Sequence, residues 1–176
     1  MPNPLVVNAA ELLRRAGSDR TVEVDVALDD LGVQDARFPD GASVAVQLHL
    51  ESNNDGIDVT GELRTPWHGT CRRCLAETSG VAVSEVHERY QRVLTDPDAF
   101  ELTGDQLDLQ PLVRELVLLD APATPLCRDD CPGLCPTCGA RLADGPCGCA
   151  PAPADDRWAA LDALRDQLGE DPETGR

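Results

Sequence analysis

Apolar and polar residues alternate along the first part of the chain, a period that predicts β-strands with one buried face. Every second residue is apolar or glycine over residues 22–28, 44–50 and 57–63. The stretch Asn53-Asn54-Asp55-Gly56 is a turn signal between the last two of these segments. We therefore expect a β-hairpin over residues 43–64.

A longer strand is expected over residues 80–93, but its apolar residues change parity along the way. Val81 and Val83 have odd numbers, whereas Val86 has an even number. A β-bulge near residues 84–85 would bring both sets to the same face of the sheet. We therefore expect a bulge at this point.

Helical signals flank the strands. Asn8 and Glu11 have the spacing of a capping box, which predicts a short helix near the start of the chain. Apolar residues at i, i+3, i+4, i+7 and i+8 predict a helix over residues 107–119, with Asp108 as its N-cap. A last helix is expected over residues 156–168, where one stripe is apolar: Trp158, Leu161, Leu164 and Leu168.

The distribution of cysteines indicates that part of the chain is not held together by an apolar core. Six of the eight cysteines lie between Cys127 and Cys149, where the only large apolar side chains are Leu134 and Leu142, with Leu126 just before them. So little apolar surface cannot offset the entropy lost on ordering the segment. No secretory signal and no membrane-length apolar run are present, which predicts a cytoplasmic protein with reduced thiols. Metal is therefore expected to hold this segment, rather than disulfide bonds.

The spacing of the cysteines predicts metal sites, and soft thiolate ligands in a reducing compartment favour zinc. A structural zinc holds four ligands, with sulfur at about 2.3 Å, and a Cys-x-x-Cys turn supplies two of them. Cys135-Pro-Thr-Cys138 is such a turn, and Cys147-Gly-Cys149 is a tighter pair. We assign the first zinc to Cys135, Cys138, Cys147 and Cys149.

A second zinc site is expected from the four remaining cysteines: Cys71, Cys74, Cys127 and Cys131. Their spacing, Cys-x-x-Cys plus Cys-x-x-x-Cys, is acceptable for such a site, which would join segments far apart in the sequence. A competing partition places Cys131 with the first set and leaves Cys127 unused. The expected cofactor is therefore one or two zinc ions per chain.

Other roles for these residues stay open at this point. Cys71 and Cys74 could form a redox pair, although the βαβ surroundings of a thioredoxin-like motif are missing. His68 could replace a thiolate as a ligand. A site with four cysteines has no free coordination position, which indicates structure rather than catalysis. The sequence also shows no nucleophile–base pair and no phosphate loop, so we expect no enzyme.

Charge restricts the class of partner. The formal net charge is −17, and two four-thiolate zinc sites would bring it to about −21. Phosphate backbones repel such a chain unless a local basic patch overrides the mean charge. A basic protein is therefore a better expected partner than naked RNA, and no membrane contact is expected. The same charge is also typical of a merely acidic, soluble surface.

These elements predict an α+β fold: an antiparallel, β-rich, barrel-like core with flanking helices and a C-terminal zinc-knuckle segment. The β-rich core with its closing helix is expected over residues 1–120, and the cysteine-rich zinc-knuckle segment over residues 121–150. A C-terminal helix and a disordered tail take residues 151–176. Pro- and Ala-rich stretches mark both boundaries.

Four motifs follow one another along the chain: Cys71-Arg-Arg-Cys74-Leu75, Asp108-Leu109-x-Pro111-Leu112-Val113, Gly133-Leu134-Cys135-Pro136-x-Cys138-Gly139 and Asp156-Arg157-Trp158-Ala159-Ala160-Leu161. This order resembles the YceD-like family, called large ribosomal RNA subunit accumulation proteins, in its actinobacterial form with an extra C-terminal cysteine cluster. The resemblance covers roughly residues 5–168. It implies a role in accumulation of 23S ribosomal RNA and in assembly of the large ribosomal subunit.

The expected function is therefore that of a non-enzymatic assembly factor. It would bind a basic ribosomal protein or the pre-ribosomal large subunit. The alternative is a zinc-knuckle module that binds proteins in regulation or transcription, unrelated to ribosomes. The identity of the bound partners would separate these two hypotheses.

Overall fold

A computed structural model describes residues 3–150 and Leu161 of this chain. The chain divides into two units, Met1–Cys131 and Pro132–Arg176. The helix expected over residues 156–168 and the tail after it lie, apart from Leu161, outside the described residues. Within the described part, no helix has the length and apolar character that crossing a membrane requires.

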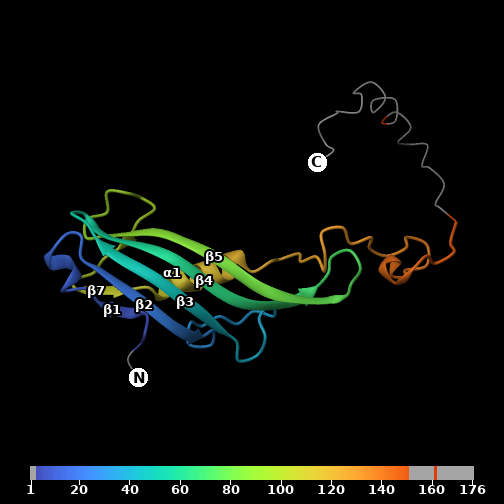
Figure 1. Cartoon of the computed structure of the whole chain (residues 1–176), viewed down its shortest axis with the longest axis horizontal. Helices are drawn as coiled ribbons and strands as arrows, with labels where there is room; N and C mark the ends of the chain where they lie inside the picture. Colours follow the sequence, from blue (N-terminus) through green and yellow to red (C-terminus); the bar gives the residue numbers. More distant parts are fainter. Residues whose placement is uncertain (1–2, 151–160, 162–176) are drawn as a thin grey trace. The chain divides into compact units, whose positions relative to one another are not determined.

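The first unit is built mainly from strands. Its elements are β1 (Val6–Asn8), the 3-10 turn η1 (Leu12–Arg14), β2 (Asp19–Ala27), β3 (Ser43–Ser52), β4 (Gly56–Thr70), β5 (Glu77–Gln91), β6 (Phe100–Glu101), β7 (Gln106–Asp108) and α1 (Gln110–Asp120). The main sheet has the strand order β2-β3-β4-β5-β6, and β1 pairs with β7 in a separate two-stranded sheet (Figure 1). All neighbours are antiparallel except β5 and β6.

The main sheet is open, so the prediction of a barrel-like core was wrong. A barrel closes only when its first and last strands pair, and here β2 and β6 are the two ends of the sheet. The strand β6 has only two residues, and both pair with β5. Helix α1 covers the apolar face instead, where it packs against β4 and β5. The sheet therefore buries its core without closing on itself.

The alternating pattern of the sequence sets the buried face of the sheet. In β3, residues 44, 46, 48 and 50 are almost completely buried, and the residues between them are more exposed. The turn after β3 is held by Asn53, whose side-chain oxygen accepts hydrogen bonds from the N–H groups of Asp55 and Gly56. The hairpin expected over residues 43–64 is thus confirmed, although β4 continues to Thr70.

Strand β5 contains no bulge, so that prediction was also wrong. It pairs with β4 in one uninterrupted register over 15 residues. Ser84 and Val86 face the core, whereas Val81 and Val83 lie on the opposite face and are 55 % and 48 % exposed. The parity change in the sequence therefore marks apolar side chains on the solvent face, rather than a distortion of the strand.

Both helices predicted before residue 120 begin later than expected, because β1 and β7 occupy the residues where they were expected to start. Residues 106–108 pair with β1 and are extended, so α1 begins at Gln110. The prediction of Asp108 as the N-cap was therefore wrong: the N-cap is Leu109, and the Asp108 carboxylate, one residue earlier, accepts a hydrogen bond from the Gln110 N–H group. The short helix expected after Asn8 is only the 3-10 turn η1.

The loop between β2 and β3 fastens the end of α1. The Arg37 guanidinium donates hydrogen bonds to the carbonyl oxygens of Ala121 (2.7 Å) and Leu118 (3.2 Å). Asp35 holds this guanidinium in place at 2.8 Å, and the Arg37 hydrogen bonds lower the pKa of Asp35 to about 2. The loop thus supplies donors to carbonyls that the helix itself leaves unpaired.

Candidate metal centres

Four sulfur atoms of the first unit lie close together although the sequence separates them widely. The Sγ atoms of Cys71, Cys74, Cys127 and Cys131 all lie within 4.8 Å of one another. Cys71 Sγ lies 3.8 Å from Cys131 Sγ, and Cys74 Sγ lies 3.7 Å from Cys127 Sγ. A tetrahedron of sulfurs about 2.3 Å from a zinc has edges of about 3.8 Å, whereas a disulfide bond is about 2.05 Å long. These distances suit a metal ion.

The turn at the end of the β4–β5 hairpin presents the first pair of sulfurs. The Leu75 N–H group donates to the Cys71 carbonyl (2.9 Å), and the Cys71 N–H group donates to the Ala76 carbonyl (2.8 Å). These bonds bend the backbone so that Cys71 and Cys74 face the same point. The long hairpin therefore carries half of the site at its end.

The second pair is brought to the hairpin by main-chain contacts. The Arg72 N–H group donates to the Pro125 carbonyl (3.0 Å). The Arg73 side chain donates to the carbonyls of Asp129 and Cys131, both at 3.1 Å. In the structure, Arg73 is a positioning residue that joins the two segments.

Hydrogen bonds within the first site favour one thiolate and disfavour another. The backbone N–H groups of Cys127, Cys74 and Arg73 point at the sulfur of Cys71 and lower the pKa of this thiol to about 6. The sulfurs around Cys127, first that of Cys131, raise the pKa of the Cys127 thiol to about 12. A fourth thiolate therefore needs a cation beside it, which a divalent metal supplies.

The second unit holds a matching group of sulfurs. The Sγ atoms of Cys135, Cys138, Cys147 and Cys149 also lie within 4.8 Å of one another. Backbone N–H groups, first that of Cys138, lower the pKa of the Cys135 thiol to about 6. Contact with the other sulfurs, first that of Cys138, raises the pKa of Cys149 to about 12. Each site thus combines one easily ionised thiol with one that keeps its proton until a cation binds.

The turns of the two sites have the same hydrogen bonds. The Gly139 N–H group donates to the Cys135 carbonyl (2.9 Å), and the Cys135 N–H group donates to the Ala140 carbonyl (2.8 Å). Gly139 therefore occupies the position that Leu75 occupies in the first turn. Both residues have positive φ angles, +73° and +58°. Leu75 is the one non-glycine residue with positive φ in the described part of the chain.

Leucine is an unfavourable residue at this position, because a left-handed backbone costs an L side chain roughly 1–2 kcal/mol. The Leu75 side chain is 65 % exposed, so burial within the chain does not offset this cost. Leu75→Gly is therefore expected to raise the free energy of unfolding by about 0.5–1 kcal/mol, after the backbone entropy of glycine is subtracted. Urea unfolding at a fixed free zinc concentration would measure this change in the free energy of unfolding.

The reciprocal change, Gly139→Leu, provides the control. It leaves the first turn unchanged and introduces the same strain into the second, so it is expected to destabilise residues 132–150. An unchanged or lowered stability of Leu75→Gly would show that the leucine makes compensating contacts within the chain.

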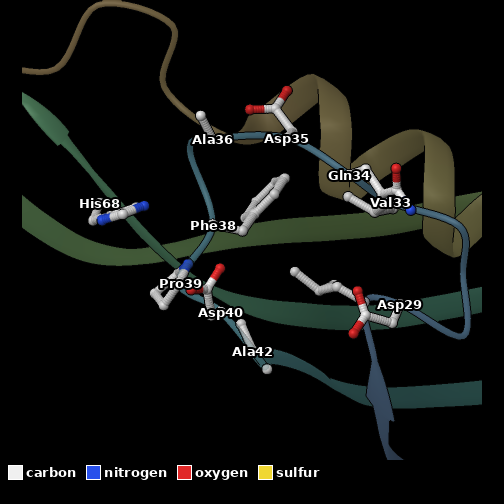
Figure 2. A pocket seen from close by; sticks show the side chains of 12 residues that line it. Asp29, Val33, Gln34, Asp35, Ala36, Phe38, Pro39, Asp40, Ala42 and His68 are labelled. Atoms are coloured by element: carbon white, nitrogen blue, oxygen red, sulfur yellow. The ribbon is translucent and has the colours of Figure 1, made fainter.

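His68, considered above as a possible ligand, is not part of either sulfur group. It lines a hollow of about 630 Å³ together with residues of the β2–β3 loop. Figure 2 shows the imidazole beside this loop, which carries Phe38 and Asp40. The backbone N–H group of His68 donates a hydrogen bond to the Arg37 carbonyl (2.8 Å). This bond places the loop beside the part of β4 that lies beyond its pairing with β3.

Over the described residues, the fold and these sites define a sheet-rich protein in which α1 covers the sheet and two four-cysteine groups could hold metal ions, an arrangement compatible with zinc. Residues 59–165 match the sequence model of the family described as "Large ribosomal RNA subunit accumulation protein YceD". The chain belongs to this family, so the resemblance seen in the sequence is confirmed.

Relatives support the same assignment. Uncharacterized proteins of Mycobacterium bovis and Mycobacterium tuberculosis are 34 % identical over 168 residues, which cover 90 % of this chain and 80 % of theirs. An Arabidopsis thaliana protein described as "Large ribosomal RNA subunit accumulation protein YCED homolog 1, chloroplastic" is 24 % identical, over 74 % of this chain and 51 % of its own. No solved structure matches the chain. The family description implies a role in accumulation of large-subunit ribosomal RNA.

Proposed function

We propose that this protein is a non-enzymatic factor for assembly of the large ribosomal subunit, on which accumulation of 23S ribosomal RNA depends. The observation that carries the proposal is the family match over residues 59–165, since the family description names large ribosomal RNA accumulation. This range contains all eight cysteines. Assembly of ribosomal subunits would place the protein in the cytoplasm.

The proposed role of the metal is structural. Four soft thiolates favour zinc, and a zinc with four protein ligands has no position left for water or substrate. Zinc bound by Cys71, Cys74, Cys127 and Cys131 would join the end of the β4–β5 hairpin to the segment after α1. Zinc bound by Cys135, Cys138, Cys147 and Cys149 would hold a segment that has very little apolar surface of its own.

The proposed partner is a basic ribosomal protein or the pre-ribosomal particle that carries it. The formal net charge of −17 supports this choice, because phosphate groups repel an acidic surface and lysine and arginine side chains are attracted to it. The protein would hold the basic partner until it is incorporated into the subunit.

Depletion of the protein in its source organism tests the proposal. We expect a lower ratio of large to small subunits in sucrose gradients, together with accumulated or degraded 23S precursor. Re-expression of the wild-type chain should restore the ratio. An unchanged ratio and normal 23S processing after complete depletion would overturn the proposed function and favour a zinc-knuckle module that acts elsewhere.

A further inference from the structure

One face of the main sheet is not covered by α1 and carries an apolar strip. Odd-numbered residues of β5 and even-numbered residues of β4 lie on this outer face, opposite to the buried one. Val81 and Val83 of β5 lie here, about half exposed, and Val81 is opposite Pro66 of β4. The pairing of β3 with β4 ends at Arg64, the β4 partner of Val83, so β4 and β5 continue without β3 from there through Pro66 and Val81.

Beside the strip, the same face carries two glutamates in direct opposition. Glu62 of β4 and Glu85 of β5 are register partners, and like charges directly opposite each other destabilise a strand pair. Arg64 forms an ion pair with Glu62 at 3.1 Å. Glu85 forms no ion pair with any described residue. The sheet thus keeps a repulsive pair that the chain itself neutralises only in part.

The acidic character continues across the sheet from this pair. Further carboxylates occupy outer positions of β2, β3 and β4: Glu23, Asp25, Glu51 and Asp58. The arginines of this face are already engaged, since Arg64 contacts Glu62 and Arg89 contacts Asp58 at 3.0 Å. A bound cationic group would therefore meet several carboxylates with little competition from the chain.

From these observations we infer that the outer face of β4 and β5, over Pro66, Val81, Val83, Glu62 and Glu85, is a docking surface for a basic protein segment. The two valines and the proline would contact an apolar side chain of the partner, and the glutamates would pair with lysine or arginine residues beside it. This inference rests on the proposed function, because it assigns the proposed basic partner to one surface. RNA fits the surface poorly, since carboxylates repel phosphates and valine offers no ring for base stacking.

The binding test uses the full-length, zinc-loaded chain, immobilised. Proteins stripped with high salt from purified large subunits of the source organism serve as one probe, and naked large-subunit ribosomal RNA serves as the other. We expect the wild-type chain to retain one or a few basic large-subunit proteins at physiological salt, and no RNA. The affinity for the retained, purified protein is then measured by titration.

The double variant Val81→Thr/Val83→Thr tests the apolar strip. Threonine keeps the β-branched shape that suits a strand but replaces a methyl group by a hydroxyl, so the fold is retained while the apolar contact is weakened. We expect about a tenfold lower affinity. The matched control is Val93→Thr, an equally simple exchange at a residue that is 74 % exposed and lies beyond the end of β5. This control should bind like the wild type.

The double variant Glu62→Gln/Glu85→Gln tests the charges. We expect weaker binding and a shallower dependence of affinity on salt, because two charge pairs with the partner are lost. The isolated chain should be equally stable or more stable, since the repulsion between the two strands is removed. A role of these glutamates in folding alone would instead lower the stability and leave the salt dependence unchanged.

The outcomes separate this inference from the proposed function. If both double variants bind large-subunit proteins like the wild type and restore the subunit ratio in depleted cells, the docking surface is wrong and the proposed function stands. Retention of 23S RNA without any basic protein would also overturn the docking surface. If depletion leaves the subunit ratio unchanged, the proposed function itself fails, whatever the variants do.

Discussion

Replacing Cys131 with serine is expected to lower the proposed zinc content from two ions per chain to one and to loosen the end of the β4–β5 hairpin. Cys131 Sγ is buried and lies 3.8 Å from Cys71 Sγ, so the change removes one ligand from an enclosed site. A structural zinc contributes roughly 10–16 kcal/mol in small peptides at neutral pH. This is comparable to the whole stability of an ordinary domain, roughly 5–15 kcal/mol.

The effect should be confined to one end of the sheet. The apolar core lies between β2–β5, α1 and the β1–β7 pair, and it does not include the cysteines. In hydrogen-exchange measurements, amides of residues 66–81 should therefore lose protection, while those of β2 and β3 keep it. Mass spectrometry of the metal gives the zinc content.

Cys138→Ser is the matched control, because it removes a ligand from the other site. It should also lose one ion, but the hairpin should keep its protection. Loss of both ions in either variant would contradict the division into two separate sites. Unchanged protection of residues 66–81 in Cys131→Ser would contradict the role of zinc in joining the hairpin to the segment after α1.

Acid is expected to release zinc from both sites. The pKa values of Cys71 and Cys135 are lowered to about 6, so these thiols favour the folded, ionised state above the ordinary thiol pKa of 9.0 and lose that contribution as the pH falls through 6. Below pH 6, protons compete with the metal even for these two sulfurs. Titration with a zinc-sensitive dye from pH 8 downwards should show a zinc affinity that falls as the pH falls, with release at a pH below the metal-free thiol pKa of about 6. A zinc affinity that does not change with pH would contradict the expected thiolate ligation.

Gly61→Ala is expected to destabilise the protein by about 3 kcal/mol or more. Gly61 lies within β4 and pairs with Leu48 of β3. Its φ angle is +143°, and an added Cβ atom would lie 2.1 Å from the carbonyl oxygen of Gln47. The carbonyl oxygen belongs to the backbone of β3, and an alanine Cβ is fixed directly to the backbone of β4, so the contact is relieved only if the strands move apart and break ladder hydrogen bonds. The sequence pattern suggested only a small residue at an inward position here.

Urea unfolding measures this effect, and Gly104→Ala separates its two causes. Gly104 also has a positive φ angle, +65°, but an added Cβ atom would meet nothing within 4 Å. Gly104→Ala should therefore show only the backbone strain, about 1 kcal/mol. Equal effects of the two substitutions would mean that the strands around Gly61 separate easily, which would contradict the tight β3–β4 pairing.

Local patterns determined much of this protein from the sequence alone. The period of two from Val22 to Leu63 predicts the buried face of three strands, because successive side chains of a strand point to opposite faces of the sheet. The turn at residues 53–56 fixes the hairpin, because its residues adopt the required backbone angles themselves. The cysteine spacing likewise predicts two sets of four, and the structure brings the sulfur atoms of each set together.

Only the tertiary structure determined the features that depend on contacts between residues far apart in the sequence. The sheet stays open because α1 packs on its apolar face and the β1–β7 pair shares the same core, and no local pattern encodes these contacts. Arg73 joins segments that lie more than fifty residues apart, so its role appears only when both are placed. The sequence predicted that a bulge brings Val81 and Val83 to the buried face, but the uninterrupted register of β5 places them on the outer face. Periodicity identifies which residues share a face, but the packing of the whole chain decides which face is buried and which stays open to a partner.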